Sequence, residues 1–172
     1  MSRHALADAL DHHSWATLRV LDACAALSPE QLESAAPGTY GSIIDTLRHI
    51  VAADAAYLYR LSGEREPRIE DDEEAKMSIA DLRAATLRHK AAWPRLLADD
   101  PEPDAIVVGY TQDGAEYHAP KGIRLAQAPH HGTDHRSQVC TALTILGIEP
   151  PEIDVWDYGQ AAGRTKEMPA SG

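Results

Sequence analysis

Three histidines fall within six positions of one short segment, AQAPHHGTDHRSQV, which spans residues 126–139. On a helix, His131 and His135 lie one turn apart, so both imidazoles project from the same face and can bind one transition-metal ion. The same spacing also occurs on solvated helices, and a metal site needs a third ligand from elsewhere. His49 can supply it from within an apolar stretch, where a hydrogen-bonded core histidine is the alternative.

The elements that must position these side chains are visible in the apolar periodicity. Four segments carry the three-and-four spacing of a helix face, and they cover residues 2–26, 42–61, 78–97 and 122–146. Pro94 should disturb the last turn of the third segment, and Pro129 makes a kink possible in the fourth. Short apolar runs on either side of Asp113-Gly114 predict a β-hairpin before the last helix. This pattern indicates an all-α four-helix bundle with one inserted hairpin.

The length of 172 residues predicts a single compact domain. We expect the bundle to occupy residues 1–160 and a flexible tail to occupy residues 161–172. The stretch GEREPRIEDDEEAK, residues 63–76, is an acidic connector between the second and third helices. We find no internal repeat.

Charge and composition exclude several classes of partner. The formal net charge of -11 repels nucleic acid and anionic lipid surfaces. The sequence has no run of about 18 apolar residues and no signal-peptide pattern at its start, so we expect a soluble, cytoplasmic protein without a membrane contact. Cys24 and Cys140 lie within helical patterns, and we expect both to be reduced packing residues.

The residues also carry a resemblance to a known family. GTYGSIIDTLRHIVAADAAYLYRLSGE followed by HHGTDHRSQV resembles the DinB/YfiT-like family of metal-dependent enzymes, which typically shows GT-x-L-x-H in the second helix and H-G-T-x-H-R-x-Q in the fourth. The likeness extends to the first helix and to the PPEIDVWDY ending. It implies an up-down-down-up four-helix bundle in which His49, His131 and His135 bind a divalent ion such as nickel or zinc.

Further residues are candidates for roles beside the metal. His13 interrupts the apolar stripe of the first helix, and it or Asp54 could orient a ligand or accept a proton. Gln138 shares the face of the two fourth-helix ligands and could bind substrate or a metal-bound water, while Arg136 could anchor an anion or pair with an acid. His130 points about 100° away from His131 and belongs at most to the rim of the site. For each of these residues, a purely structural role is the alternative.

Three neutral imidazoles would leave coordination positions open to water, a thiol or a substrate oxygen. The HExxH pattern of metalloproteases is absent, because Gly132 stands where the glutamate base would be. The resemblance implies a thiol S-transferase or related detoxification enzyme in which the ion activates a low-molecular-weight thiol as cosubstrate for a small-molecule substrate. The alternatives are a metal-dependent hydrolase using bound hydroxide and a non-catalytic metal-binding or ligand-binding bundle.

Ala-rich helix faces and the resemblance together predict a homodimer.

Overall fold

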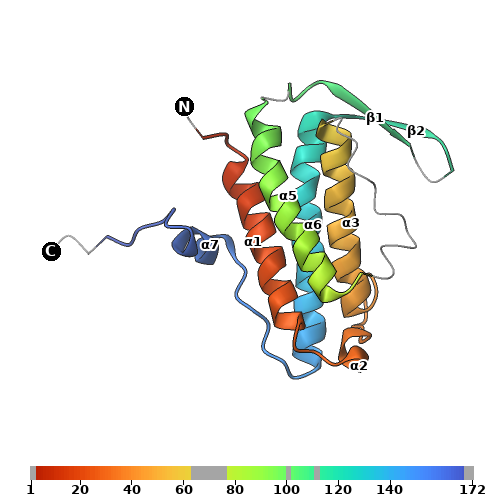
Figure 1. Cartoon of the computed structure of the whole chain (residues 1–172), viewed down its shortest axis with the longest axis vertical. Coiled ribbons are helices and arrows are strands. Elements are labelled where there is room, and N and C mark those ends of the chain that lie inside the picture. Colours follow the sequence, from red (N-terminus) through yellow and green to blue (C-terminus); the bar gives the residue numbers. More distant parts are fainter. Residues whose placement is uncertain (1–2, 63–76, 100–101, 111–112, 169–172) are drawn as a thin grey trace.

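Four long helices lie side by side in the computed structural model, which describes residues 3–62, 77–99, 102–110 and 113–168 (Figure 1). The long helices are α1 (Ala7–Cys24), α3 (Ile43–Ser62), α5 (Ile79–Ala98) and α6 (Lys121–Ile145), and short helices α2 (Pro29–Leu32) and α7 (Val155–Ala161) accompany them. The four predicted helical segments are confirmed. The predicted acidic connector, residues 63–76, lies outside the described residues.

The connectivity makes this an up-down-down-up bundle. Helix α1 packs on α5 and α6, and α3 packs on the same two helices. Along the chain colours, α3 and α5 run in one direction while α1 and α6 run in the other (Figure 1). The predicted fold class is therefore confirmed, including the hairpin that precedes α6.

The hairpin consists of β1 (Ile106–Tyr110) and β2 (Glu116–Pro120), which pair in antiparallel register. Gly114 lies in the turn with φ +84°, a conformation that suits a residue without Cβ. On the helix side, the Arg124 guanidinium donates to the carbonyl of Val107 and thereby ties the hairpin to α6. Residues 111–112, which precede the predicted Asp113-Gly114 turn, lie outside the described residues.

Local capping explains where the helices begin and end. Ser78 and Asp81 form a capping box at the start of α5. Gly147, with φ +73°, follows the end of α6 and takes the left-handed conformation common after a helix. The two prolines disturb the helices less than we expected, because α5 continues past Pro94 to Ala98 and α6 is continuous through Pro129.

The bundle interior contains two apolar clusters separated by a polar layer. One cluster includes Cys24, Ile43, Leu82 and Leu143, and the other includes Leu10, Leu58, Trp93 and Leu125. On each long helix, polar or titratable residues fall between the positions that belong to the two clusters: His13 and Thr17 on α1, Asp54 on α3, Thr86 and His89 on α5, and Arg136 on α6. On α6, Arg136 of this layer directly follows His135, one of the candidate metal ligands.

Helix α7 is an element that the periodicity did not predict. Tyr158 packs edge-on against the rings of His12 and Trp15, which holds α7 on α1. The following segment is tied to the same helix by a hydrogen-bonded ion pair between Arg164 and Asp8. The division into a bundle and a flexible tail from residue 161 stays a prediction. Among the described helices, none combines the length and the apolar character needed to cross a membrane.

The packing predicts a strong position dependence along α5. Leu82 is fully buried in the first apolar cluster, so Leu82→Ala should lower the free energy of unfolding by about 2–5 kcal/mol. The matched control is Leu87→Ala, because Leu87 is 43% exposed on the same helix. This substitution should lower the free energy of unfolding by no more than about 0.5 kcal/mol. Urea unfolding of both variants measures the difference, and equal costs would contradict the assignment of the core.

Candidate metal centre

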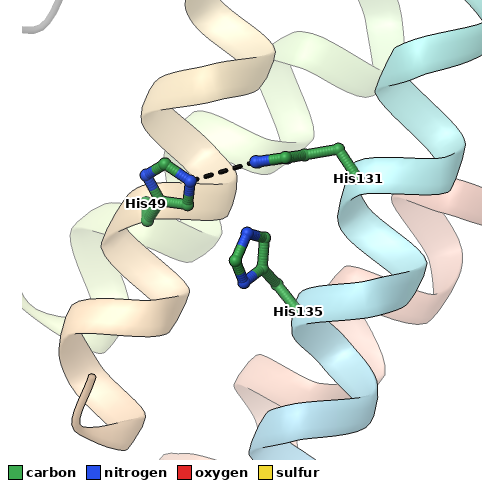
Figure 2. Close-up of side chains that lie close together, drawn as sticks. All are labelled: His49, His131 and His135. Carbon is green, nitrogen blue, oxygen red and sulfur yellow. Dashed lines mark hydrogen bonds between the residues drawn. The ribbon is translucent and has the colours of Figure 1, made fainter. Parts of the chain in front are cut away.

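Three half-buried histidines converge between α3 and α6. His49 comes from the first half of α3, and His131 and His135 come from successive turns of α6 (Figure 2). Their ring centroids are 4.5 to 4.8 Å apart in every pairing. The structure therefore brings together the three residues that the sequence analysis selected as ligands.

The geometry suits one small ion between the rings. One nitrogen from each histidine can be chosen so that all three lie within 4.8 Å of one another. The His49 and His131 Nε2 atoms are 3.0 Å apart, close to the separation of about 3.3 Å that two nitrogens have on a tetrahedral ion with bonds of about 2.0–2.1 Å. The three histidines could thus hold a metal after small ring rotations.

The electrostatics keep His131 and His49 neutral at neutral pH, as metal ligands must be. Burial, together with the neighbouring rings of His135 and His49, lowers the pKa of His131 to about 4. Burial also lowers the pKa of His49, again with a contribution from His135. In addition, His131 Nδ1 is buried without a hydrogen-bond partner among the described residues. Protonation of His131 and His49 is therefore unfavourable, whereas a metal ion can bind to the neutral rings.

Tyr40 and Gln138 frame the histidines on the side of the loop before α3. The Tyr40 ring stacks on His49 at a centroid distance of 4.1 Å and meets His135 edge-on at 5.3 Å. Gln138 Oε1 accepts hydrogen bonds from the Tyr40 backbone N–H and from His135 Nδ1. Because that bond places the His135 hydrogen on Nδ1, its Nε2 keeps a lone pair for a metal.

His13 and Asp54 are not among the clustered ligands but hydrogen-bond to each other. His13 Nε2 lies 2.8 and 2.9 Å from the two carboxylate oxygens of Asp54, and both side chains are buried. On the other side of the imidazole, Arg136 Nη1 contacts His13 Nδ1 at 2.9 Å. Arg136 is itself buried, and burial lowers its pKa to about 10, which leaves it charged at neutral pH. Its partners thus include a histidine within the bundle.

His130 lies on a different side of α6 from the ligands. It is exposed, and it lines a cavity of about 730 Å³ between α1, α6 and residues 150–155. His12 and Cys140 line the same cavity. The structure thus separates His130 from the three-histidine cluster, as its angle on the helix predicted.

Neither cysteine supplies a ligand or a reactive thiolate. Cys24 is buried in the first apolar cluster, and burial raises its pKa to about 12. Burial also raises the pKa of Cys140. Both thiols are free and stay protonated at neutral pH, in agreement with the packing role expected for them.

Sequence reasoning missed the part played by Tyr40. A single aromatic residue in a loop carries no periodicity, so nothing in its spacing points to His49. Its neighbours offered one signal, because Gly38 and Gly41 mark a loop that can bring the backbone close to a helix. The direct bond between His13 and Asp54 was missed too, although each residue was selected separately.

Comparison with known proteins agrees with this architecture. A family model described as "DinB family" matches residues 1–168. The crystal structure of a DinB-like protein from Bacillus cereus matches with a TM-score of 0.61 at 19% identity, over 83% of this chain and 91% of that one. This second likeness speaks for the fold alone. The comparison with curated proteins gives no match.

The convergence of His49, His131 and His135 predicts loss of metal when any one of them is removed. Each single His→Ala variant should bind Zn²⁺ or Ni²⁺ at least tenfold more weakly, because two imidazoles make an incomplete site. Metal analysis after dialysis against a fixed free concentration measures occupancy. His130→Ala is the matched control on α6, and wild-type occupancy in all three ligand variants would exclude the site.

The lowered pKa of His131 predicts how metal-free protein responds to acid. Between about pH 6.5, the ordinary histidine pKa, and pH 4, the unfolded chain takes up a proton at His131 that the folded protein does not. The free energy of unfolding should therefore fall as pH falls through this window. Urea unfolding from pH 7 to 4.5 should show a shallower fall for His131→Gln, with His130→Gln as the control for removal of one imidazole. An unchanged slope in His131→Gln would contradict the burial of a neutral ring.

Proposed function

Because the chain belongs to the DinB family, we propose that it is a divalent-metal-dependent thiol S-transferase in which the three-histidine centre activates a low-molecular-weight thiol. The observation that carries the proposal is the composition of the cluster. Among the residues that the structure describes, the group that could hold a metal ion consists of three imidazoles and contains no carboxylate or thiol. Such a centre binds the ion without neutralising its charge and keeps positions open for an incoming anionic ligand.

The chemistry required of the metal is simple: a bound Zn²⁺ or Ni²⁺ would stabilise the thiolate form of a thiol. Imidazole ligands suit either ion, so the donor set supports both. The chain contributes His49, His131 and His135 as ligands. Gln138 fixes the tautomer and the orientation of His135 through its hydrogen bond to Nδ1.

A nucleophile brought by a cosubstrate fits the surroundings of the site. Cys24 and Cys140 are protonated packing residues. Asp54 and His13 are bonded to each other inside the bundle, so neither is a free base beside the histidines. This arrangement favours thiol activation over a hydrolase, which commonly uses a side chain to take a proton from water.

Tyr40 is the residue we place beside the incoming substrate. Its ring packs on two of the three ligands, yet 56% of the residue is exposed. It therefore forms an aromatic wall between solvent and the histidines. In this proposal, Tyr40 shields one side of the thiolate from water and contacts the apolar part of a small electrophile.

A screen of thiols against electrophiles on metal-loaded protein tests this function. We expect consumption of an electrophile, such as an epoxide or an activated aryl halide, that requires both the metal and one added thiol. His131→Ala should lower the rate at least a hundredfold, because the thiolate loses its stabilising cation. The control is His130→Ala, which leaves the three ligands intact.

The other outcomes of that screen separate the alternatives. Turnover of esters or amides without a thiol would indicate a hydrolase that uses metal-bound hydroxide. Stoichiometric metal without turnover across the panel would indicate a non-catalytic binding bundle. Either result would overturn the transferase proposal while leaving the metal site in place.

A further inference from the structure

The hydrogen bonds of His13 determine which groups donate and which accept among His13, Asp54 and Arg136. A guanidinium only donates, so His13 Nδ1 must accept from Arg136 Nη1. The hydrogen of the imidazole is then on Nε2, where both Asp54 oxygens accept it. His13 thus connects the buried guanidinium of Arg136 to the buried carboxyl group of Asp54.

These three side chains come from three helices and connect all of them. His13 is on α1, Asp54 on α3 and Arg136 on α6, and their residues are 0, 2 and 1% exposed. Arg136 gains further acceptors from Thr17 on α1 and from Thr133 on its own helix. A charge buried this deeply is tolerated only where its partners are held in place.

Gly132 makes the close approach of α1 and α6 possible. A Cβ at this position would lie 2.3 Å from His13 Cε1, 2.5 Å from His13 Nδ1 and 2.7 Å from Arg136 Nη1. Any side chain would therefore push His13 or Arg136 out of place. This contact gives a physical reason for glycine immediately after His131.

The connection between this layer and the metal site lies in the sequence of α6. His131 is followed by Gly132 and His135 by Arg136, so each of the two candidate ligands on α6 has as its neighbour a residue in close contact with His13. On α3, Asp54 lies five residues after His49. The two helices that carry the ligands are thus both bonded to the same imidazole.

We propose that His13, Asp54 and Arg136 form a positioning cluster, accommodated by Gly132, that fixes α3 against α6 at the separation at which His49 meets His131 and His135. The three residues act on the metal through the helices and do not contact it. The cluster would hold the ligands in place before an ion arrives, which reduces the ordering that binding requires. The affinity readout below rests on the proposed metal function, whereas the structural readout does not.

Two substitutions at His13 separate its two bonds. In His13→Gln, the amide nitrogen takes the place of Nε2 and can still donate to Asp54. In His13→Asn, the amide oxygen takes the place of Nδ1 and can still accept from Arg136. Arg136 keeps Thr17 and Thr133 as acceptors in either variant, but the described residues offer the Asp54 carboxylate no other hydrogen-bond donor. His13→Asn should therefore be the more damaging change.

Titration with Co²⁺ as a spectroscopic probe tests the cluster. We expect His13→Asn to bind Co²⁺ at least tenfold more weakly than the wild type, with shifted visible bands, and His13→Gln to retain more of the affinity. The matched control is Leu97→Ala, a core truncation on α5 in the second apolar cluster, which should destabilise the fold and leave the affinity within twofold. Wild-type affinity and bands in His13→Asn, or an equal loss in Leu97→Ala, would overturn the proposal.

Further measurements keep the inference testable if a variant fails to fold or if the wild type binds no metal. Thr17→Val removes one acceptor of Arg136 with little change of shape and should weaken Co²⁺ binding twofold to fivefold; an unchanged affinity counts against the cluster. A crystal structure of metal-free His13→Asn should show the His49–His131 contact of 3.0 Å lengthened or lost, and an unchanged contact refutes the cluster. A wild type that binds no Co²⁺ refutes the proposed function alone, and the metal-free structures then decide the positioning role.

Discussion

A guanidinium buried in the middle of a four-helix bundle is the constraint on which the other features depend. Arg136 remains charged although it is 1% exposed, so the surrounding helices must supply both acceptors and a counter-charge. They do so through His13, which carries the interaction on to Asp54. The interior is therefore divided into two apolar clusters by a polar layer, and the relative positions of α1, α3 and α6 follow from hydrogen bonds that have direction as well as from packing.

The three-histidine centre differs from this polar layer in whether its ring nitrogens have hydrogen-bond partners within the protein. His13 has both nitrogens engaged, whereas His131 has a buried nitrogen without a partner among the described residues. His49 and His131 instead face each other through their Nε2 atoms, and one of those atoms must act as donor if no cation lies between them. His13 is thus satisfied by the protein itself, whereas the half-buried His49, His131 and His135 could share a metal ion as their partner. The contrast lies in the contacts, since the polar layer and the three-histidine centre both include residues of the same short segment of α6.

How much the sequence predicts depends on the range of each interaction. Helix periodicity and the Asp-Gly turn are local, and they predicted the four helices and the hairpin correctly. The spacing of His131 and His135 is also local, so their common face could be inferred, whereas the choice of His49 relied on a family resemblance. The bond between His13 and Asp54 depends on how α1 and α3 are placed against each other, which no periodicity specifies. Tyr40 and α7 were missed because loop contacts and a seven-residue helix leave no repeated apolar pattern.

The positions of the three-histidine centre and of the residues that contact His13 are coupled through α6. His131 and His135 face α3 and meet His49, while Gly132 and Arg136 meet His13 of α1. Successive residues on a helix are rotated by about 100°, so one short segment serves two neighbouring helices at once. A rotation of α6 that improved one set of contacts would disturb the other, because both are attached to the same backbone turns. The HG-xx-HR order of residues 131–136 is thus a single structural unit, in which the ligands and the residues that anchor their helix alternate along the chain.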